Sequence, residues 1–205
     1  MSERQTEYQA GAVPDASVIV ETLLDEGAVL LRGYVDDEEQ HAICEEVLAH
    51  ELAEHDKSDQ PIPEQFHAAE WDQSAAPPLT RALGARITGL LDPALPDWRI
   101  NHVRAQLYAP GEAGIEWHRD YTRDLRVIAV ASFLGASLFQ ARLTSGEKSW
   151  QLQPGDLTLL RGTLLSGNLD DRPYHRVSPP EKGRRLSLAY REVASEKPIL
   201  EPQHV

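Results

Sequence analysis

The sequence predicts an α+β fold, in which N-terminal helices pack on one sheet of a double-stranded β-helix (jelly-roll) core. Before residue 97 apolar residues recur at helical spacing, whereas from Trp98 onward short apolar stretches are separated by Gly, Pro and Asp. Eight strands that follow helices, without an internal repeat, match a jelly-roll barrel built from two sheets.

The composition is that of one globular domain: 205 residues, of which 41% are hydrophobic and 26% are charged. We expect a flexible tail over residues 1–14 and a single domain over 15–205, with a helical front (15–97) and a jelly-roll core (98–192). No stretch approaches eighteen consecutive apolar residues and the N-terminus is polar, so we expect no membrane span and no secretory signal. The single cysteine, Cys44, suits a reducing compartment, and we expect a cytoplasmic protein.

The elements of the front follow from periodicity and caps. Asp36 or Asp37 can cap a helix whose first turn is acidic, as the helix dipole favours. A later helix begins at a proline, carries leucine and isoleucine at helical spacing and ends before Asp92-Pro93. The predicted elements are a helix over 16–25, a buried strand over 28–35, a helix from about 37 to about 55, and a helix over 78–91.

Residues 56–78 are polar, contain several prolines and show no periodicity. A loop of this length is unusual in a compact domain, so we expect a mobile lid over a site. Trp71 in this segment either stacks on a flat substrate or anchors the loop to the core, and both interpretations stay open.

The core is expected to contain short strands divided by turn residues. Their predicted positions are 100–108, 114–118, 126–134, 137–143, 149–153, 157–161, 172–178 and 185–192.

The tripeptide His118-Arg119-Asp120, followed 55 residues after the aspartate by His175, supplies two imidazoles and one carboxylate in the order used by non-haem iron oxygenases. Alternate residues of a strand point to the same face, so His118 and Asp120 could bind one ion from an extended segment. His175 would then arrive from a neighbouring strand. By the same alternation, Trp117 should point away from the ion and into the core. Three such ligands leave positions open for a cosubstrate and O₂.

Arg185 and Arg191 lie in the last predicted strand, among alternating apolar residues. Arginines held in the interior of a sheet need an anion to pair with. A guanidinium engages a carboxylate through two parallel hydrogen bonds, so one of these arginines could hold a dicarboxylate by its far end while the near end chelates the metal. That dicarboxylate would be 2-oxoglutarate.

Several motifs fall in register along the second half of the chain. They are Leu107-Tyr108-Ala109-Pro110-Gly111, His118-x-Asp120, Ser132-Phe133-Leu134-Gly135 with Phe139, Pro154-Gly155-Asp156-Leu157, Tyr174-His175 and Arg185-x-Ser187-x-x-x-Arg191. In order and spacing they resemble the AlkB-like 2-oxoglutarate and Fe(II)-dependent dioxygenases over roughly residues 98–192, about half of the chain.

The resemblance implies that His118, Asp120 and His175 bind Fe(II), with 2-oxoglutarate and O₂ as cosubstrates. It also implies the reaction: decarboxylation of 2-oxoglutarate to succinate and CO₂ is coupled to hydroxylation of a substrate C–H bond. If that carbon is a methyl group on nitrogen, the hydroxylated product loses formaldehyde and the net result is demethylation.

For the cosubstrate, the resemblance implies that Arg185 pairs with the distal carboxylate of 2-oxoglutarate and that Tyr108 hydrogen-bonds the same end. Arg191 would serve the end nearer the metal. The family usually has asparagine where this chain has Gln106 and Ser187. Both replacements remain polar and can hydrogen-bond, so we expect them to help bind the cosubstrate.

The residues expected to border the substrate are Trp71, Tyr121, Thr122 and Asp124. Members of the family that repair nucleobases usually carry an acidic residue two positions after the metal-binding aspartate. This chain has Thr122 at that position, which argues against recognition of a base.

Charge is spread unevenly. The net charge is −13, and residues 1–100 hold 21 acidic and 6 basic side chains, or −15, whereas residues 101–205 hold 12 and 14, or +2. Proteins that bind phosphate backbones normally present a basic face, so the acidic front argues against strong nucleic-acid binding. Most of these acids are expected to form solvated helix faces.

An active Fe(II) and 2-oxoglutarate dioxygenase is the main hypothesis. Its substrate stays open: the resemblance favours a nucleobase, whereas the acidic front and Thr122 favour a small molecule or a protein side chain. Two other classes compete with an active enzyme. One is a catalytically silent binding module on the same barrel, and the other is a zinc site, which would leave the two strand arginines without an evident partner.

Overall fold

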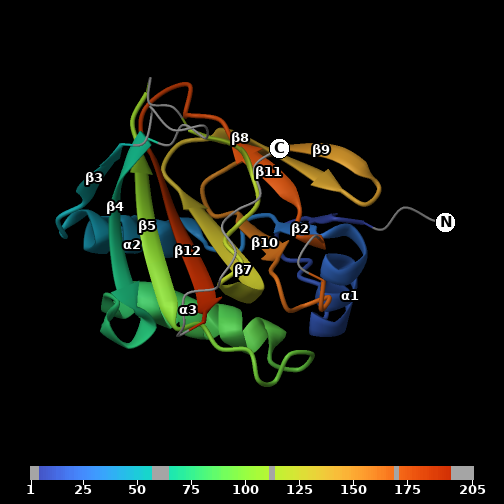
Figure 1. Ribbon diagram of the computed structural model, residues 1–205. Coiled ribbons are helices and arrows are strands. Elements are labelled where there is room, and N and C mark those ends of the chain that lie inside the picture. The colour runs from blue at the N-terminus through green and yellow to red at the C-terminus, as the bar shows by residue number, and fades with distance from the viewer. Residues whose placement is uncertain (1–4, 57–64, 111–113, 169–170, 195–205) are drawn as a thin grey trace.

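Two sheets form the body of the molecule in the computed structural model, which describes residues 5–56, 65–110, 114–168 and 171–194. The larger sheet has eight strands in the order β1-β2-β10-β7-β12-β5-β4-β3, and the smaller has four in the order β6-β11-β8-β9 (Figure 1). Buried side chains of both sheets, such as Ile128 and Leu160 from the larger and Phe139 and Trp150 from the smaller, form one hydrophobic cluster between them. This is the expected α+β jelly-roll arrangement.

The strands of the larger sheet are antiparallel except for the pair β1 and β2. Their bounds are β1 Glu7–Tyr8, β2 Ala28–Leu31, β10 Leu157–Arg161, β7 Asp124–Phe133, β12 Arg185–Val193, β5 His102–Tyr108, β4 Gln65–Asp72 and β3 Ala53–Asp56. The smaller sheet is antiparallel throughout and contains β6 Ile115–His118, β11 Tyr174–Val177, β8 Ser137–Leu143 and β9 Gly146–Leu152.

Three α-helices cover the outer face of the larger sheet: α1 Ala16–Glu26, α2 Asp37–Leu48 and α3 Pro78–Leu91, the last preceded by a short 3₁₀ turn, Gln73–Ala75. The Asp36 side chain caps α2 by accepting a hydrogen bond from the backbone N–H of Glu39 at 2.9 Å. The first backbone N–H groups of α3 are satisfied differently, because the Glu46 carboxylate on α2 accepts from Leu79 at 2.8 Å and from Thr80 at 2.9 Å. The helices are therefore tied to one another as well as to the sheet. None of the helices among the described residues is long and apolar enough to cross a membrane.

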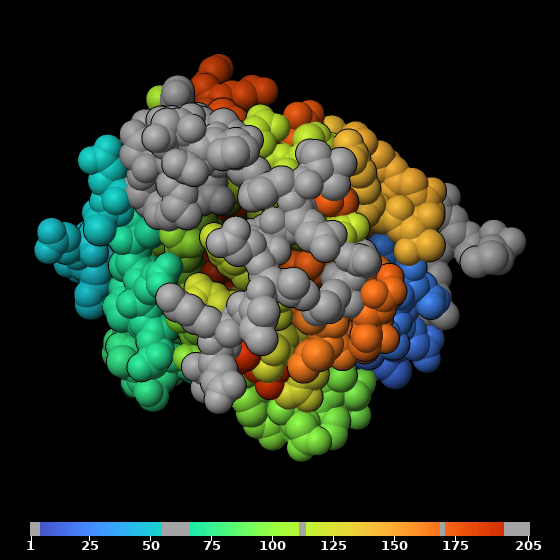
Figure 2. All heavy atoms as spheres, viewed as in Figure 1, coloured from blue at the N-terminus to red at the C-terminus, as the bar shows by residue number. Residues whose placement is uncertain are grey.

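Strand alternation on β12 separates the two faces of the larger sheet. Leu186, Leu188 and Tyr190 belong to the hydrophobic core beneath the helices, whereas Arg185 and Arg191 line a pocket on the opposite face. The face that carries the pocket therefore presents arginines, while the helix-facing side is apolar. Figure 2 views the molecule with the teal atoms of β4 on one side and the golden hairpin of β8 and β9 on the other.

Most predicted elements are confirmed. The helix over 78–91 has the expected bounds, and each of the eight strands predicted after residue 98 is present with ends within about three residues of the prediction. The helix predicted to reach about residue 55 ends at Leu48, however, and the buried strand predicted over 28–35 ends at Leu31.

The interpretation of residues 56–78 as an irregular loop is wrong for part of that stretch. Residues 65–72 form β4, which pairs with β5 on one side and β3 on the other. Nothing in their local composition predicts a strand, because the strand is stabilised by hydrogen bonds to neighbours that lie elsewhere in the sequence. Residues 57–64, the rest of the predicted lid, lie outside the described residues.

The predicted tail over residues 1–14 also needs correction. Glu7–Tyr8 form β1, and the backbone N–H groups of Leu30 and Arg32 donate to Thr6 and Tyr8, both at 2.8 Å. The Arg32 guanidinium adds an ion pair to Glu7 at 2.8 Å. Two residues of strand leave no periodicity in a sequence, which is why the pairing was not expected. Residues 1–4 lie outside the described part.

Candidate metal centre and cosubstrate pocket

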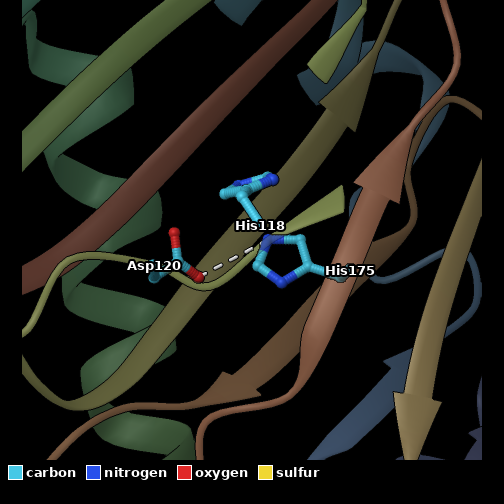
Figure 3. Close-up of side chains that lie close together, drawn as sticks. All are labelled: His118, Asp120 and His175. Atoms are coloured by element: carbon cyan, nitrogen blue, oxygen red, sulfur yellow. Dashed lines mark ion pairs between the residues drawn. The ribbon is translucent and has the colours of Figure 1, made fainter. Parts of the chain in front are cut away.

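His118, Asp120 and His175 lie close together, as predicted. One ligand atom from each lies within 4.8 Å of the others, and the Nε2 atom of His175 is 3.6 Å from a carboxylate oxygen of Asp120. His118 ends β6, Asp120 follows two residues later in the irregular segment between β6 and β7, and His175 comes from β11, so the third ligand arrives from a neighbouring strand as expected. Figure 3 shows the three side chains pointing toward one another.

The hydrogen bonds of the two imidazoles leave one nitrogen of each ring available to a metal. The Nδ1 atom of His118 is 2.7 Å from the carbonyl oxygen of Glu116, and the Nδ1 atom of His175 is 3.1 Å from that of Pro173. A carbonyl oxygen only accepts, so in both rings Nδ1 carries the proton and Nε2 keeps its lone pair. Backbone partners of this kind fix the tautomer and orientation of metal-binding histidines.

A bulge in β6 brings His118 opposite His175. In the β6–β11 ladder His118 pairs with His175 and Ile115 pairs with Val177, so two residues of β6 oppose a single residue of β11 between these pairs. Both Ile115 and His118 therefore line the pocket, although an unbroken alternation would turn them to opposite faces.

Trp117 points away from the candidate ligands, as expected, but the expectation that it is part of the core is wrong. Trp117 is half-buried on the outer face of the smaller sheet, where the guanidinium of Arg142 lies 4.6 Å from its ring centre and that of Arg176 lies 5.2 Å away. These distances are those of cation–π contacts.

Burial and neighbouring charges set the protonation of the ligands. Burial lowers the pKa of His175 to about 4, and nearby His118 acts in the same direction. Burial opposes the ionisation of Asp120, but the positive charges of its neighbours, His175 first and Arg191 next, hold its pKa below the ordinary value. At neutral pH the site therefore offers a neutral imidazole from His175 and a carboxylate from Asp120, the forms that bind a metal ion.

Arg172 is a site residue that the sequence did not predict. Its side chain is 3% exposed, and one terminal nitrogen donates a hydrogen bond to the backbone carbonyl of Asp120. Because Arg172 lies three residues before His175, this bond links the segments that carry two of the ligands. No sequence signal separates this arginine from one on the surface.

The residues predicted to bind 2-oxoglutarate lie in one pocket with the three candidate ligands. Described residues that line it include Gln106, Tyr108, Arg185, Ser187 and Arg191, together with His118, Asp120 and His175. Gln106 and Tyr108 come from β5 and the other three from the adjacent β12, where Arg185 is the direct cross-strand partner of Tyr108. The structure thus brings these residues together, and their roles in binding the cosubstrate stay predictions.

Arg185 is buried, and no carboxylate of the described residues pairs with it. It is 3% exposed, and its hydrogen bonds go to the hydroxyls of Ser187 at 3.4 Å and Ser132 at 3.3 Å. The guanidinium also lies 5.5 Å from the ring centre of Tyr108, and its Nε atom has no hydrogen-bond partner among the described residues. Burial lowers the pKa of Arg185. A buried cation held by two hydroxyls and a ring is suited to receive an anion from the pocket.

Thr158 on β10 is a second pocket residue that the sequence did not single out. It is buried and lines the pocket, and its hydroxyl oxygen has no hydrogen-bond partner among the residues that the structure describes. The donor set and these two unsatisfied polar groups fit Fe(II) together with a dicarboxylate. The same ligand set accepts zinc, but zinc alone would leave Arg185 without an anion.

The four residues expected to border the substrate do not line this pocket. Trp71 is half-buried on the helix-facing side of β4, opposite Val103, with its ring 5.7 Å from that of His50. This place agrees with the second interpretation, an anchor to the core. Thr122 and Asp124 are buried at 8% and 1% exposure, and Tyr121 is half-buried. Substrate contact by these residues stays a prediction.

No protein-family model matches the chain, and no curated protein matches it. Among solved structures, a Pseudomonas putida prolyl-4-hydroxylase is similar, with a TM-score of 0.64 and 19% identity over 87% of this chain and 100% of that one. The non-heme alpha-ketoglutarate-dependent carbocyclase SnoK from nogalamycin biosynthesis has a TM-score of 0.67 and 15% identity over 89% of this chain and 87% of that one. The non-heme alpha-ketoglutarate-dependent epimerase SnoN from the same biosynthesis has a TM-score of 0.66 and 15% identity over 85% of this chain and 79% of that one. This chain therefore has the same fold as the prolyl-4-hydroxylase and these two alpha-ketoglutarate-dependent enzymes.

Proposed function

We propose that the protein is an Fe(II)- and 2-oxoglutarate-dependent dioxygenase that hydroxylates a C–H bond of its substrate. The observation that carries this proposal is the shared pocket. The buried guanidinium of Arg185, which has no carboxylate partner in the part of the chain that the structure describes, lies in one cavity with the His118, Asp120 and His175 donors. A silent binding module could retain this arrangement, but it would not need three metal-binding side chains beside a buried guanidinium.

When bound, Fe(II) and 2-oxoglutarate would activate O₂, so that decarboxylation of the cosubstrate to succinate and CO₂ is coupled to oxidation of the substrate. The protein supplies position and environment. His118, Asp120 and His175 would hold the metal on one side, and Arg185 would bind the distal carboxylate of 2-oxoglutarate. The pocket walls are partly apolar, with Phe139 and Leu160 among them, and such walls exclude water from the reacting groups.

For the substrate, we infer a compact polar molecule or a protein side chain. Beside the pocket, Glu70 on β4 lies 3.0 Å from Arg104 and 3.5 Å from His102, both on β5. His102 is the cross-strand neighbour of Arg191, which lines the pocket. Charged groups at this place favour a substrate that exchanges hydrogen bonds with them. The prolyl-4-hydroxylase and the enzymes of nogalamycin biosynthesis with the same fold support a substrate other than nucleic acid.

Oxidative N-demethylation of a nucleobase is the second candidate, and the AlkB-like motifs favour it. The net charge of −15 in residues 1–100 opposes it, since a phosphate backbone would meet a strongly negative half of the chain. Thr122, in place of the acidic residue usual in members that repair bases, is also buried.

The test of the chemistry is formation of succinate from 2-oxoglutarate with Fe(II) and O₂, with and without candidate substrates. The wild type is expected to form succinate, whereas Asp120→Ala should fall to the background without enzyme while keeping its far-UV circular dichroism spectrum. Asp92→Ala is the matched control, because within the described ranges this exposed carboxylate pairs only with the exposed Arg99, at 3.1 Å. Full activity in Asp120→Ala would mean that the ligand assignment is wrong.

The substrate class is tested by the acceleration of succinate formation. Free amino acids, peptides, small metabolites and methylated oligonucleotides are compared at one salt concentration, and the product is identified by mass. We expect acceleration by a small molecule or peptide, and only weak, strongly salt-sensitive DNA binding. Nanomolar DNA affinity at physiological salt, or release of formaldehyde from a methylated base, would favour the second candidate.

A further inference from the structure

Asp124, at the start of β7, is a buried carboxylate that the proposed reaction does not use. It is 1% exposed, and neither of its side-chain oxygens has a hydrogen-bond partner among the described residues. Its ion-pair partner is Arg191, whose Nε atom lies 3.8 Å from a carboxylate oxygen of Asp124. A buried carboxylate without hydrogen-bond donors is unfavourable, so the burial of this charge needs an explanation.

The backbone fixes the place from which the Asp124 side chain projects. The N–H of Asp124 donates to the carbonyl of Tyr121 at 3.0 Å, and its own carbonyl accepts from the N–H of Thr163 at 3.1 Å. The pairing of β7 with β12 is irregular here: Arg191 pairs with Ile128, and the register then shifts before Val193 reaches Asp124. The carboxylate therefore approaches Arg191 from a firmly held turn.

The side chain of Arg191 makes no hydrogen bond to any other described residue, although Arg191 is only 8% exposed and lines the pocket with the candidate ligands. A long side chain without hydrogen bonds would exchange between rotamers unless a charge restrained it. Three carboxylates, Asp124 first, then Asp120 and Glu70, raise the pKa of Arg191 against the effect of burial. Asp124 is the one among them that forms a direct ion pair with the Nε edge of the guanidinium.

We propose that Asp124 is a positioning residue, which holds the Nε edge of Arg191 so that the other N–H groups of this guanidinium face the pocket and receive the carboxylate of 2-oxoglutarate nearer the metal. The inference rests on the proposed function. It gives the buried Asp124 carboxylate a role, and it explains what holds an arginine side chain that makes no hydrogen bond to the described residues. A fork of N–H groups that is already oriented loses less entropy when it binds a carboxylate.

The experiment measures 2-oxoglutarate binding calorimetrically to protein loaded with Mn(II), without O₂, and Mn(II) binding separately. Asp124→Asn keeps the size of the side chain and removes its charge, and we expect about tenfold weaker 2-oxoglutarate binding with Mn(II) affinity changed by less than about twofold. Arg191→Gln should weaken 2-oxoglutarate binding by at least as much. The double variant, Asp124→Asn with Arg191→Gln, should bind 2-oxoglutarate no more weakly than Arg191→Gln alone. Asp92→Asn is the control and should bind as the wild type does.

Arg191→Lys is the second variant, and it keeps the proposal testable if Asp124→Asn does not fold. Lysine retains the positive charge but lacks the fork that Asp124 would orient, so 2-oxoglutarate binding should again fall about tenfold. Unchanged binding in Asp124→Asn, full binding in Arg191→Lys, or losses that add in the double variant would each overturn the positioning role. If the metal-loaded wild type does not bind 2-oxoglutarate, the proposed function falls with it, whereas wild-type binding that Asp124→Asn leaves intact removes only this inference.

Discussion

The guanidinium of Arg172 donates a hydrogen bond to the backbone carbonyl of Asp120, 52 residues earlier in the chain. Arg172 is almost fully buried and lies next to Pro173, whose carbonyl meets the Nδ1 atom of His175 at 3.1 Å. One short segment therefore orients two candidate metal ligands, one through a side chain and the other through a backbone carbonyl. Hydrogen-bond partners of metal ligands determine how precisely the ligands are positioned around the ion.

We accordingly expect Arg172→Gln to weaken Fe(II) or Mn(II) binding by about tenfold or more, because the segment that carries Asp120 loses its restraint. The metal titration is read beside the thermal unfolding curve. Arg142→Gln is the matched control, since this arginine is about half exposed on the outer face of the smaller sheet. Equal metal affinity in the two variants would show that Arg172 does not restrain the segment that carries Asp120.

Substitution of Arg185 should weaken the binding of 2-oxoglutarate and leave the metal affinity nearly unchanged. Arg185→Gln removes the buried cation, so we expect the KM for 2-oxoglutarate to rise about 10- to 100-fold, while metal affinity stays within about twofold of the wild type. Arg185→Lys should recover only part of this loss, because an ammonium group cannot make two parallel hydrogen bonds to a carboxylate. An unchanged KM in both variants would place the distal carboxylate elsewhere.

The sequence predicted the site better than its surroundings. The ligands and pocket residues could be found because their types and spacing are unusual, as in His118-x-Asp120 with a later histidine and two arginines six residues apart on one strand. Strands of the core could be found because turn residues separate them. Thr158 and Arg172 could not be found from the sequence, because a threonine in an apolar strand and an arginine before a proline are common in any chain.

Other features depend on pairing between distant segments, which local patterns do not encode. β4 forms because β5 and β3 satisfy its backbone, and the position of both Ile115 and His118 at the pocket depends on the register of β6 against β11. A bulge adds one residue to one strand and so reverses the expected alternation. Periodicity predicted the strand and the direction of Trp117 away from the ligands, but it did not predict that this side chain is only half-buried.

Ionised Glu70 should increase the free energy of unfolding, and this contribution should disappear at low pH. Its pKa is lowered from the ordinary 4.5 to about 2, first by the hydrogen bond with His102 and also by the charges of Arg104 and Arg191, against a burial effect that raises it. Because the folded pKa is the lower one, the unfolded chain binds a proton more readily in this range. The contribution of Glu70 is therefore full above about pH 4.5 and is lost as the pH falls toward about 2.

Glu70→Gln removes this contribution. We expect the free energy of unfolding of the variant to be lower than that of the wild type at pH 7, by on the order of 1 kcal/mol because Glu70 is about half exposed. The difference should shrink as urea unfolding is repeated at lower pH, from about 4.5 downward. Glu45→Gln, whose carboxylate pairs with the exposed His41, is the control and should show a smaller difference. A Glu70→Gln difference that is the same at pH 7 and pH 3.5 would mean that the depressed pKa does not stabilise the fold.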